Sequence, residues 1–585
     1  MREWWNSQTR ASQTAWLLVA VLTLFSLRLF HIQVIDHKTY LTKADNMQTD
    51  RRTLAAVRGQ IFVRDADGNI APLVLNRTVY TLFADPSEIR NLDGAKNIIK
   101  QVVGDHVLDG AIDKLSDHKR RYVVIAHELS QDQAKTIREQ KIAGLGLARA
   151  NQRVYPEGGL AAQTLGFVNA EGKGQYGIEQ SLNDRLSGRP GLLKTVTDVS
   201  KVPLTIGVND VSIPAKDGES VVLSIDRNIQ SQAEEILAAG LKNAKATTGS
   251  MVVMDPNTGR VLAMANLPSF DPENYRKVQT PAAYANKVTM DAFEPGSIMK
   301  LFTVASGLDS GAITPASTFR NNGCVQVDDA KMCNVERAVD GRMLQPMHIL
   351  EYSLNTGAVW VLEQMSGGTI SLVGRQRLYD YFANHFRLNA RTGIELANEA
   401  DSVLYPPNYK NGPRVLYANM TFGQGEQLTM IQVISAFSSV MNGGKYFKPT
   451  VILGSYDPLK QVLTEQAPKL LSDNVISAQH SAELRDMLYQ ARYLGAKGRL
   501  RDNGYYVGGK SGTAQKVDPL TGKYSHTLTT GTYIGYGADK TKTPRYVIMV
   551  RVDDAHNGGY SGSAAAQPIF DQMSKFMNQY QGVSK

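Results

Sequence analysis

Apolar residues occur mostly in short segments separated by polar turns, and only the first forty residues contain a long apolar run. That run covers Ala15–Leu27, "AWLLVAVLTLFSL", and resumes after Arg28 as "LFHIQVI". The first segment is too short to cross roughly 30 Å of hydrocarbon, but continuation to Ile35 makes it long enough. A cleaved signal peptide is the alternative, although no small-x-small cleavage site follows closely. We expect an uncleaved anchor over 14–35 after a short cytoplasmic tail, 1–13, with the bulk of the chain outside.

The pattern after the anchor predicts a first folded segment over residues 36–215. In it, "VRGQIFVRDADGNIAPLVL" predicts two strands around an Asp-Ala-Asp-Gly turn. Residues 86–150 alternate helical patterns with short strands, and the glycine-rich residues 155–195 are expected to form loops. A new strand then runs to Ile225, and Asp226 is placed to cap an amphipathic helix. A domain boundary is therefore expected near 216, with a second domain over 216–585.

The second domain begins and ends with predicted strands. "TTGSMVVMDPNTGRVLAMANL" is a hairpin whose Asp-Pro-Asn-Thr-Gly turn separates two apolar strands. "GTYIGYGA" and "RYVIMVRVDD" predict further strands near the carboxyl end. Strands at both ends with helices between them favour an α+β fold, in which helices pack on an antiparallel sheet completed by distant segments. The expected helices cover 297–310, 345–366, 372–388, 428–442 and 566–580.

Composition and charge narrow the class of protein. The chain has 585 residues, of which 42% are hydrophobic and 20% charged, and this composition is globular. The formal net charge is +9 without a long Lys/Arg block, so nucleic acid is not expected as a partner.

Cys324 and Cys333 are the two cysteines, and both lie in a polar loop. A local disulfide is expected if this loop is outside the cytoplasm, and two unpaired thiols are the alternative. Without nearby histidines the pair does not make a zinc site. We expect no metal and no cofactor.

The segment "GYYVGGKSGTAQ", residues 504–515, matches two motifs. Gly504–Ser511 fits the G-x-x-x-x-G-K-[ST] loop that binds nucleotide phosphates, which requires a buried strand before it and a helix after it. Here a polar turn precedes the motif, and the following residues contain a proline and a turn. The pattern instead predicts a strand over Tyr505–Val517, a turn and another strand. This favours the K-[ST]-G box of serine acyltransferases, formed by Lys510, Ser511 and Gly512.

Two further boxes complete that set. Ser297 and Lys300 form S-x-x-K at the predicted start of an apolar helix, where positions i and i+3 share a face. Burial of a lysine on such a helix lowers its pKa and makes a neutral amine available as a proton acceptor. Ser353 and Asn355 form S-x-N between two apolar helical segments. These residues could instead cap a helix, which would not exclude catalysis.

Both short motifs occur a second time. Ser116 and Lys119 form another S-x-x-K in a highly charged stretch, and Ser181 and Asn183 form another S-x-N in the glycine-rich region. Only the copies that begin at Ser297 and Ser353 lie in one domain with the K-S-G box, so we assign the site to them.

The whole chain resembles class B penicillin-binding proteins, the monofunctional D,D-transpeptidases of peptidoglycan synthesis. Beyond the three boxes, the resemblance includes "RGQIFVRDADGNIAP" with Arg58 and Gly59, "RVYPEGGLAAQTLGFVNAEGKGQYGIEQSLNDRLSGRPG" and "MTFGQGEQLTMIQVISAFSSVMNGG". The segment "FADPSEI" and the length are more similar to the division type than to the elongation type. The resemblance implies a mostly β, elongated pedestal over 36–215 and a transpeptidase domain over 216–585, with helices on both sides of its sheet.

The resemblance also implies roles for the site residues. Ser297 is the acylated nucleophile, Lys300 its base and Ser353 a proton shuttle. Lys510 supplies positive charge, and Asn355 holds the donor amide. The remaining implied groups are the carboxylate-binding residues Ser511 and Thr513, the glycine Gly512 between them, and an oxyanion hole made by the N–H groups of Ser297 and Thr513.

The chain departs from the family pattern at three places, none of which removes a catalytic group. Ser511 stands where threonine is commoner, and Gln424 stands where an aromatic residue is frequent. The segment "TGIELANEADS" lacks the usual Pro-Gly-Glu. These differences are expected to affect the fit of substrate or β-lactam.

The implied substrates and partners are D-Ala-D-Ala stem peptides, β-lactams, a SEDS-type glycosyltransferase and other divisome membrane proteins. The implied location is the cytoplasmic membrane, crossed once, with the catalytic domain outside. Two alternatives remain: a D,D-carboxypeptidase or β-lactamase of the same fold, and an anchored scaffold with a vestigial site. No separate glutamate box for activating water was found, because Glu395 and Glu399 fall in a non-catalytic segment of the family.

Overall fold

The structure of the protein is a computed structural model, and its described residues form two compact units. One unit contains the described parts of 1–58 and 187–218, and the other those of 59–186 and 219–585. Each unit is described by itself below. The structure describes residues 9–41, 49–65, 67–196, 211–335, 339–411, 413–495, 505–517, 524–556 and 562–583.

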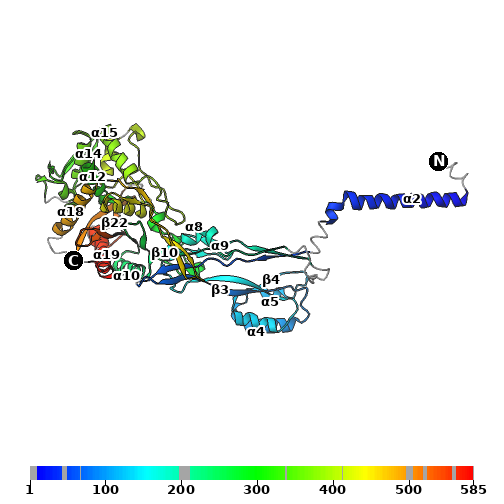
Figure 1. Ribbon diagram of the computed structural model, residues 1–585. Helices are drawn as coiled ribbons and strands as arrows, with labels where there is room; N and C mark the ends of the chain where they lie inside the picture. Colours follow the sequence, from blue (N-terminus) through cyan, green and yellow to red (C-terminus); the bar gives the residue numbers. More distant parts are fainter. Residues whose placement is uncertain are drawn as a thin grey trace. The chain divides into compact units, whose positions relative to one another are not determined.

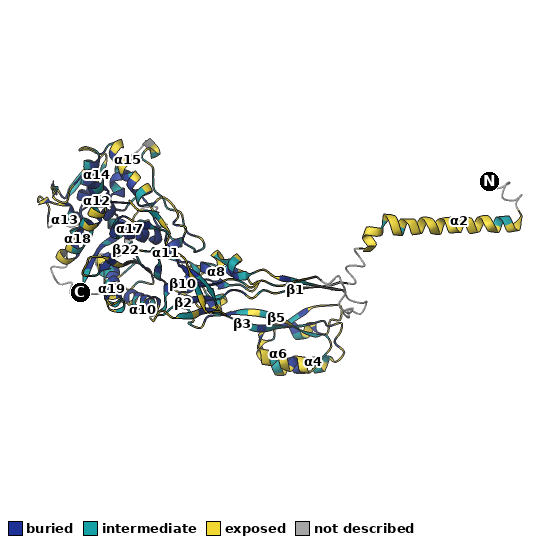
Figure 2. Ribbon diagram, in the orientation of Figure 1, coloured by how far each residue is buried: buried dark blue, intermediate teal, exposed yellow. Residues whose placement is uncertain are grey.

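The first unit contains the apolar N-terminal helix. Helix α2 spans Arg10–Phe30 and continues as a π-helical turn over His31–Ile35. Thr9 caps it, because the threonine Oγ1 accepts a hydrogen bond from the Ser12 N–H at 3.3 Å. Its apolar side chains are exposed (Figure 2), and it is long and apolar enough to cross a membrane. The same unit contains an antiparallel three-stranded sheet, with β1 at Thr49–Leu54, β8 at Gly191–Val196 and β9 at Val211–Ile213.

The second unit contains a seven-stranded sheet that begins with the hairpin predicted after the anchor. Strand β2 covers Ile61–Arg64 and β3 covers Ile70–Ala84, so that prediction is confirmed, although β3 is far longer than its pattern suggested. The strand order is β19-β18-β10-β2-β3-β4, and β5 pairs with β3. The other strands are β4 (Val123–Leu129), β5 (Leu145–Val154), β10 (Ser220–Asp226), β18 (Ile452–Asp457) and β19 (Val462–Glu465).

This sheet pairs segments from both sides of residue 216. Strand β10 pairs with β2 in parallel and with β18 in antiparallel fashion. The domain boundary expected near 216 remains a prediction, because β10 belongs to one sheet with strands from each side of that point.

Two amphipathic helices cover part of the β3–β4 surface. Helix α4 spans Leu92–Val103, and α6 spans Gln131–Glu139, as the helical pattern in "SQDQAKTIREQ" predicted. Ser130 and Gln133 form a capping box at the start of α6. Residues 155–195, expected to be loops, instead contain short elements: α7 (Ala162–Leu165), β6 (Phe167–Val168), β7 (Gly174–Gln175), α8 (Gly177–Ser181) and α9 (Asn183–Ser187).

A five-stranded antiparallel sheet is the framework of the part of the second unit that carries the three predicted boxes. Its order is β12-β11-β23-β22-β21, so the predicted hairpin pairs with strands from the far carboxyl end. This confirms that distant segments complete the sheet, as the strand pattern predicts. The strands are β11 (Thr248–Met254), β12 (Val261–Leu267), β21 (Tyr506–Val517), β22 (Tyr524–Ala538) and β23 (Pro544–Asp553).

Alternating side chains of this sheet build two separate cores. Met251 and Val253 belong to a core with α10 (Arg227–Ala244) and α19 (Gln567–Tyr580). Val252 and Met254 belong to the larger core, which includes α12 (Met299–Asp309) and α17 (Met430–Met441). Figure 1 shows helices on both sides of β22, which confirms the α+β class and the two covered faces.

The helices of the middle region differ from the prediction at two points. The range 345–366, expected as helix with the S-x-N box between two apolar helical segments, contains two helices, α13 (Pro346–Glu351) and α14 (Asn355–Met365). Ser353, with a φ of 54°, interrupts the helical backbone between them. Helix α15 (Leu372–Asp380) ends in a π-helical turn at His385.

One long helix was not predicted. Helix α18 spans Ala478–Gly495, and its buried apolar side chains are Leu484, Met487, Leu488 and Ala491. Their i, i+3, i+4, i+7 spacing is a helical signal that the surrounding polar residues obscured.

Candidate active site

The first box lies at the start of α12. Ser297 is in a 3₁₀ turn over Gly296–Ile298, and Lys300 follows one turn later. The lysine Nζ donates a hydrogen bond to the Ser297 Oγ at 2.8 Å, as the i, i+3 spacing predicted. Lys300 is only 1% exposed, because the helix around it is apolar on all sides. A serine hydroxyl is therefore paired with a fully buried amine.

The second box brings another hydroxyl to the same amine. Lys300 Nζ lies 3.1 Å from Ser353 Oγ and donates to the Ser353 carbonyl oxygen at 2.6 Å. The left-handed backbone of Ser353 costs free energy for a residue with a side chain, of order 1–3 kcal/mol. That conformation places Ser353 between α13 and α14 and turns its hydroxyl toward Lys300.

The third box completes the cluster from the edge of the sheet. Lys510 on β21 is 4% exposed, and its Nζ donates to Ser353 Oγ at 3.0 Å and to the Ser511 carbonyl at 2.8 Å. The two lysines thus meet at one hydroxyl. The segment from Tyr506 to Val517 is a strand paired with β22, so the backbone of this motif is not a phosphate-binding loop leading into a helix.

The turn that carries Ser297 is held by close backbone contacts. Gly423 has a φ of 90°, and a Cβ on it would lie 2.0 Å from the Gly296 carbonyl oxygen. The Gly296 N–H donates to the Gly423 carbonyl at 3.0 Å, and Thr532 Oγ1 on β22 donates to the Pro295 carbonyl at 3.2 Å. Only glycine fits this approach, so the FG-x-G segment fixes the turn before Ser297.

Burial controls the charge of both lysines. It lowers the pKa of Lys510 to about 7. Burial also lowers the pKa of Lys300 well below its usual range, and the nearby charge of Lys510 lowers it further. Two ammonium groups within about 3 Å of one hydroxyl repel each other, so one proton is readily lost. The arrangement provides a neutral amine at Lys300 beside the cation of Lys510.

These groups border an open groove of about 970 Å³. The predicted site residues that line it are Ser297, Ser353, Asn355, Ser511, Gly512 and Thr513. Among the described residues lining the groove there is no Asp or Glu, and one wall is the hairpin that contains Cys333. The structure therefore brings all predicted site residues together, with the two lysines beneath the groove surface.

The second copies of the motifs lie in other settings. Ser116 and Lys119 are exposed after the short helix α5 (Ala111–Lys114). Ser181 Oγ donates to the Glu395 carbonyl at 2.7 Å, and Asn183 Oδ1 accepts from the Gly174 N–H at 3.0 Å. These contacts stabilise local backbone.

The two glutamates of the non-catalytic segment are also engaged structurally. Glu395 pairs with Lys448 at 2.9 Å, and Glu399 accepts hydrogen bonds from Thr392 and Gly393.

Two carboxyl groups beside the turn that carries Ser297 were not singled out from the sequence. Glu294 accepts hydrogen bonds from the Gly425 N–H and the Tyr524 hydroxyl, each at 2.9 Å, and burial raises its pKa. Glu426 is fully buried, and neither of its carboxyl oxygens has a hydrogen-bond partner in the part of the chain the structure describes. Burial, with the charge of Glu294, raises the Glu426 pKa well above its usual range. A signal was available, since Glu294 lies three residues before Ser297 and Glu426 lies in the quoted segment "MTFGQGEQLTMIQVISAFSSVMNGG".

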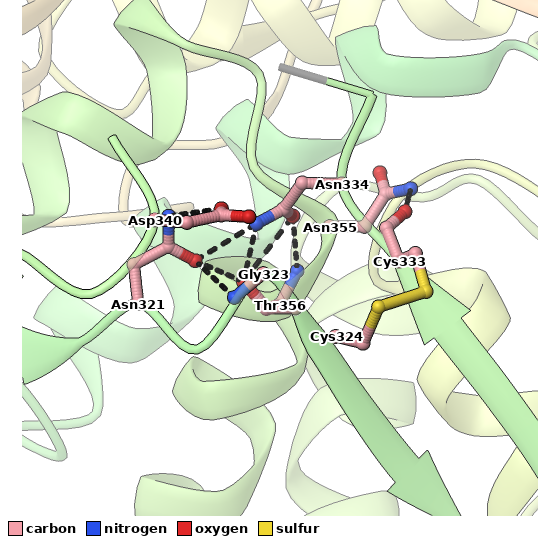
Figure 3. The surroundings of a disulfide bond; sticks show 8 residues. All are labelled: Asn321, Gly323, Cys324, Cys333, Asn334, Asp340, Asn355 and Thr356. Atoms are coloured by element: carbon pink, nitrogen blue, oxygen red, sulfur yellow. Dashed lines mark hydrogen bonds between the residues drawn. A yellow bond between two sulfur atoms is a disulfide. The ribbon is translucent and has the colours of Figure 1, made fainter. Parts of the chain in front are cut away.

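The structure contains a disulfide between Cys324 and Cys333 (Figure 3). The two residues are directly opposite in the hairpin of β14 (Cys324–Val327) and β15 (Ala330–Cys333). By the loop-entropy argument, so small a ring stabilises the folded chain by roughly 2–3 kcal/mol.

We expect non-reduced peptide mapping of the mature protein to recover residues 324 and 333 in one linked fragment. Iodoacetamide should label neither cysteine without prior reduction and both after it, because the local ring persists in an oxidising compartment. Recovery of both cysteines as alkylated thiols from a sample quenched in acid would contradict the disulfide.

A sheet with helices on both faces and a site of paired Ser–Lys, S-x-N and K-S-G boxes defines the class of serine-type penicillin-binding enzymes. Residues 249–575 match the penicillin binding protein transpeptidase domain, and residues 53–223 match the penicillin-binding protein dimerisation domain. The chain belongs to the penicillin-binding protein transpeptidase family, which confirms the resemblance found in the sequence.

Curated relatives and solved structures agree with this assignment. The chain is 29% identical to stage V sporulation protein D of Bacillus subtilis (strain 168), over 94% of this chain and 82% of the relative. It is 28% identical to peptidoglycan D,D-transpeptidase FtsI of Escherichia coli (strain K12), over 93% of this chain and 87% of the relative. A peptidoglycan synthetase structure from Bifidobacterium adolescentis has a TM-score of 0.71, with 24% identity over 92% of this chain and 97% of that one, and shows the same fold.

Proposed function

We propose that the protein is a membrane-anchored serine D,D-transpeptidase that cross-links peptidoglycan stem peptides through an acyl-Ser297 intermediate. The observation that supports this most strongly is the meeting of Lys300, Ser353 and Lys510 around the Ser297 hydroxyl. The printed name of the FtsI relative, a peptidoglycan D,D-transpeptidase, supports the substrate class.

The acylation step uses the neutral amine. Lys300 takes the Ser297 proton as the serine Oγ bonds to the carbonyl carbon of the penultimate D-alanine of the donor. The bond from that carbon to the terminal D-alanine nitrogen then breaks. Ser353, which contacts both lysines, relays the proton to the departing amine. An acceptor amine reverses these transfers, forms the new amide and restores the serine hydroxyl.

The remaining groups bind the donor. Lys510, Ser511 and Thr513 hold its terminal carboxylate, and Asn355 holds its peptide amide. The backbone N–H groups of Ser297 and Thr513 stabilise the developing oxyanion. The adjacency of β21 to the nucleophile turn supports this, since a Cβ on Gly296 would lie 3.0 Å from the Thr513 carbonyl oxygen.

A hydrolase of the same fold is the second candidate. A β-lactamase or D,D-carboxypeptidase must deliver water to the acyl-serine, and no carboxylate lines the described part of the groove. Glu294 is the carboxyl group nearest in sequence, but Gly425 and Tyr524 engage it. This favours transfer to an amine over transfer to water.

Anchoring and partners complete the proposal. Helix α2 supports a single crossing of the cytoplasmic membrane, with the catalytic part outside. The division-like features of the sequence support a role in septal wall synthesis, together with a SEDS-type glycosyltransferase and other divisome membrane proteins. β-Lactams acylate the same serine.

Intact mass spectrometry after exposure to penicillin tests the proposal. We expect one covalent adduct per chain on Ser297 that persists for hours, since no Asp or Glu is among the described residues that line the groove. Rapid release of hydrolysed drug would instead indicate a β-lactamase. Failure to form any adduct would contradict the acyl-serine proposal.

A further inference from the structure

Outside the three boxes, a buried polar network joins the disulfide hairpin to the helix of the second box. Asn321, Asn334 and Thr356 are 0%, 4% and 8% exposed. Asn334 Nδ2 donates to Asn321 Oδ1 at 2.8 Å and to Thr356 Oγ1 at 2.9 Å. The Thr356 hydroxyl donates to Asn321 Oδ1 at 3.0 Å. Figure 3 shows this closed set of amides and hydroxyl.

The network fixes the first turn of α14. Asn334 Oδ1 accepts a hydrogen bond from the Thr356 backbone N–H at 3.0 Å. This N–H is one of the helix-start donors that have no partner within the helix, so the asparagine acts as a cap supplied by a distant segment. Thr356 directly follows Asn355, the residue expected to hold the donor amide.

The backbone beside Asn334 holds Asn355 itself. Asn355 Nδ2 donates to the Cys333 carbonyl at 2.9 Å, and Asn334 N donates to the Gly323 carbonyl across the hairpin at 2.9 Å. Two consecutive residues of the hairpin segment, Cys333 and Asn334, therefore accept hydrogen bonds from two consecutive residues of α14, Asn355 and Thr356. The bond to the Cys333 carbonyl orients the side-chain amide of Asn355. The bond from the Thr356 N–H to Asn334 positions the helix backbone next to Asn355.

We propose that Asn334 is a positioning residue for Asn355, and this rests on the proposed function of the groove. It touches no substrate. It sets the amide plane of Asn355 through the hairpin, so that one N–H and the carbonyl oxygen of that amide face the groove at a fixed angle. A satisfied buried network has one preferred arrangement. The catalytic serines and lysines make none of their hydrogen bonds to Asn334 in the described part of the chain.

The proposal predicts selective and non-additive losses. Asn334→Ala should lower the second-order rate of Ser297 labelling by a penicillin with an acylamino side chain by about ten- to a hundredfold, because the amide partner is misplaced. Labelling by 6-aminopenicillanic acid, which lacks the acyl group that Asn355 would bind, should change less than threefold. The double variant with Asn355→Ala should be no slower than Asn355→Ala alone, since both changes remove one interaction.

Matched variants separate positioning from damage to the fold. Asn384→Ala, an exchange at an exposed asparagine, should leave both rates unchanged. Thr356→Ser keeps the hydroxyl and should retain the wild-type ratio of the two rates, whereas Thr356→Val removes it and should lower the ratio as Asn334→Ala does. If Asn334→Ala does not fold, the comparison of Thr356→Ser with Thr356→Val tests the positioning role.

Two results would overturn the proposal. One is an equal loss with both penicillins in Asn334→Ala and in Thr356→Val. The other is a double variant slower than Asn355→Ala by the full factor of the single Asn334 change. A wild type that forms no adduct at Ser297 would instead contradict the proposed function.

Discussion

Ser297→Ala is expected to abolish the covalent penicillin adduct while the protein remains folded. The exchange removes the proposed attacking atom, the Ser297 Oγ, which accepts a hydrogen bond from Lys300 Nζ at 2.8 Å. It leaves the buried side chains of α12 in place. The loss should be total within detection, because the other hydroxyl bonded to Lys300, that of Ser353, lies on a strained turn and also accepts from Lys510. Fluorescent penicillin labelling and thermal unfolding measure the two properties.

Ser116→Ala provides the matched control, since it removes the serine of the second S-x-x-K motif. This residue is exposed, and its variant should label at the wild-type rate. An adduct that survives in Ser297→Ala, or that peptide mapping places at Ser116, would show that the box assignment is wrong.

The site could be predicted because each box is short and its geometry is local. The contact between Ser297 and Lys300 follows from helical spacing alone. The β character of the segment around Lys510 followed from its bulky residues and from the proline beyond it. The meeting of three distant boxes did not follow from local pattern, and the family resemblance supplied that expectation.

The unpredicted features depend on tertiary contacts. The break between α13 and α14 depends on the left-handed backbone of Ser353, and the apolar pattern, which placed Ser353 between two helical segments, does not reveal that conformation. Asn334 lies in a polar loop by sequence, and only folding brings it to Thr356. The burial of Glu426 was likewise not predictable from the sequence, since a charged residue in a loop is expected at the surface.

Lys510→Ala is expected to slow acylation of Ser297 by roughly 10²–10³-fold, the usual loss when one preorganised hydrogen-bond donor is removed from an active site. The ammonium contacts Ser353 Oγ and is placed beside the proposed carboxylate site. In a nucleotide-binding protein the same exchange would abolish ATP binding, so calorimetry with ATP is run beside the labelling assay. We expect no measurable ATP affinity in the wild type. Lys119→Ala, an exposed lysine of the other S-x-x-K copy, is the control.

The pH profile gives the sharper form of this prediction. The second-order labelling rate reports on the free enzyme, in which burial lowers the pKa of Lys510 to about 7. The group is a cation below that pH and neutral above it, so the wild-type rate should fall as pH rises through about 7. Lys510→Arg should recover only part of the rate, because arginine keeps the positive charge but its guanidinium group is larger than the ammonium. This variant should also lose the alkaline decline, because the guanidinium does not titrate in this pH range. An unchanged rate in Lys510→Ala, or the same alkaline decline in all three proteins, would contradict the role of Lys510.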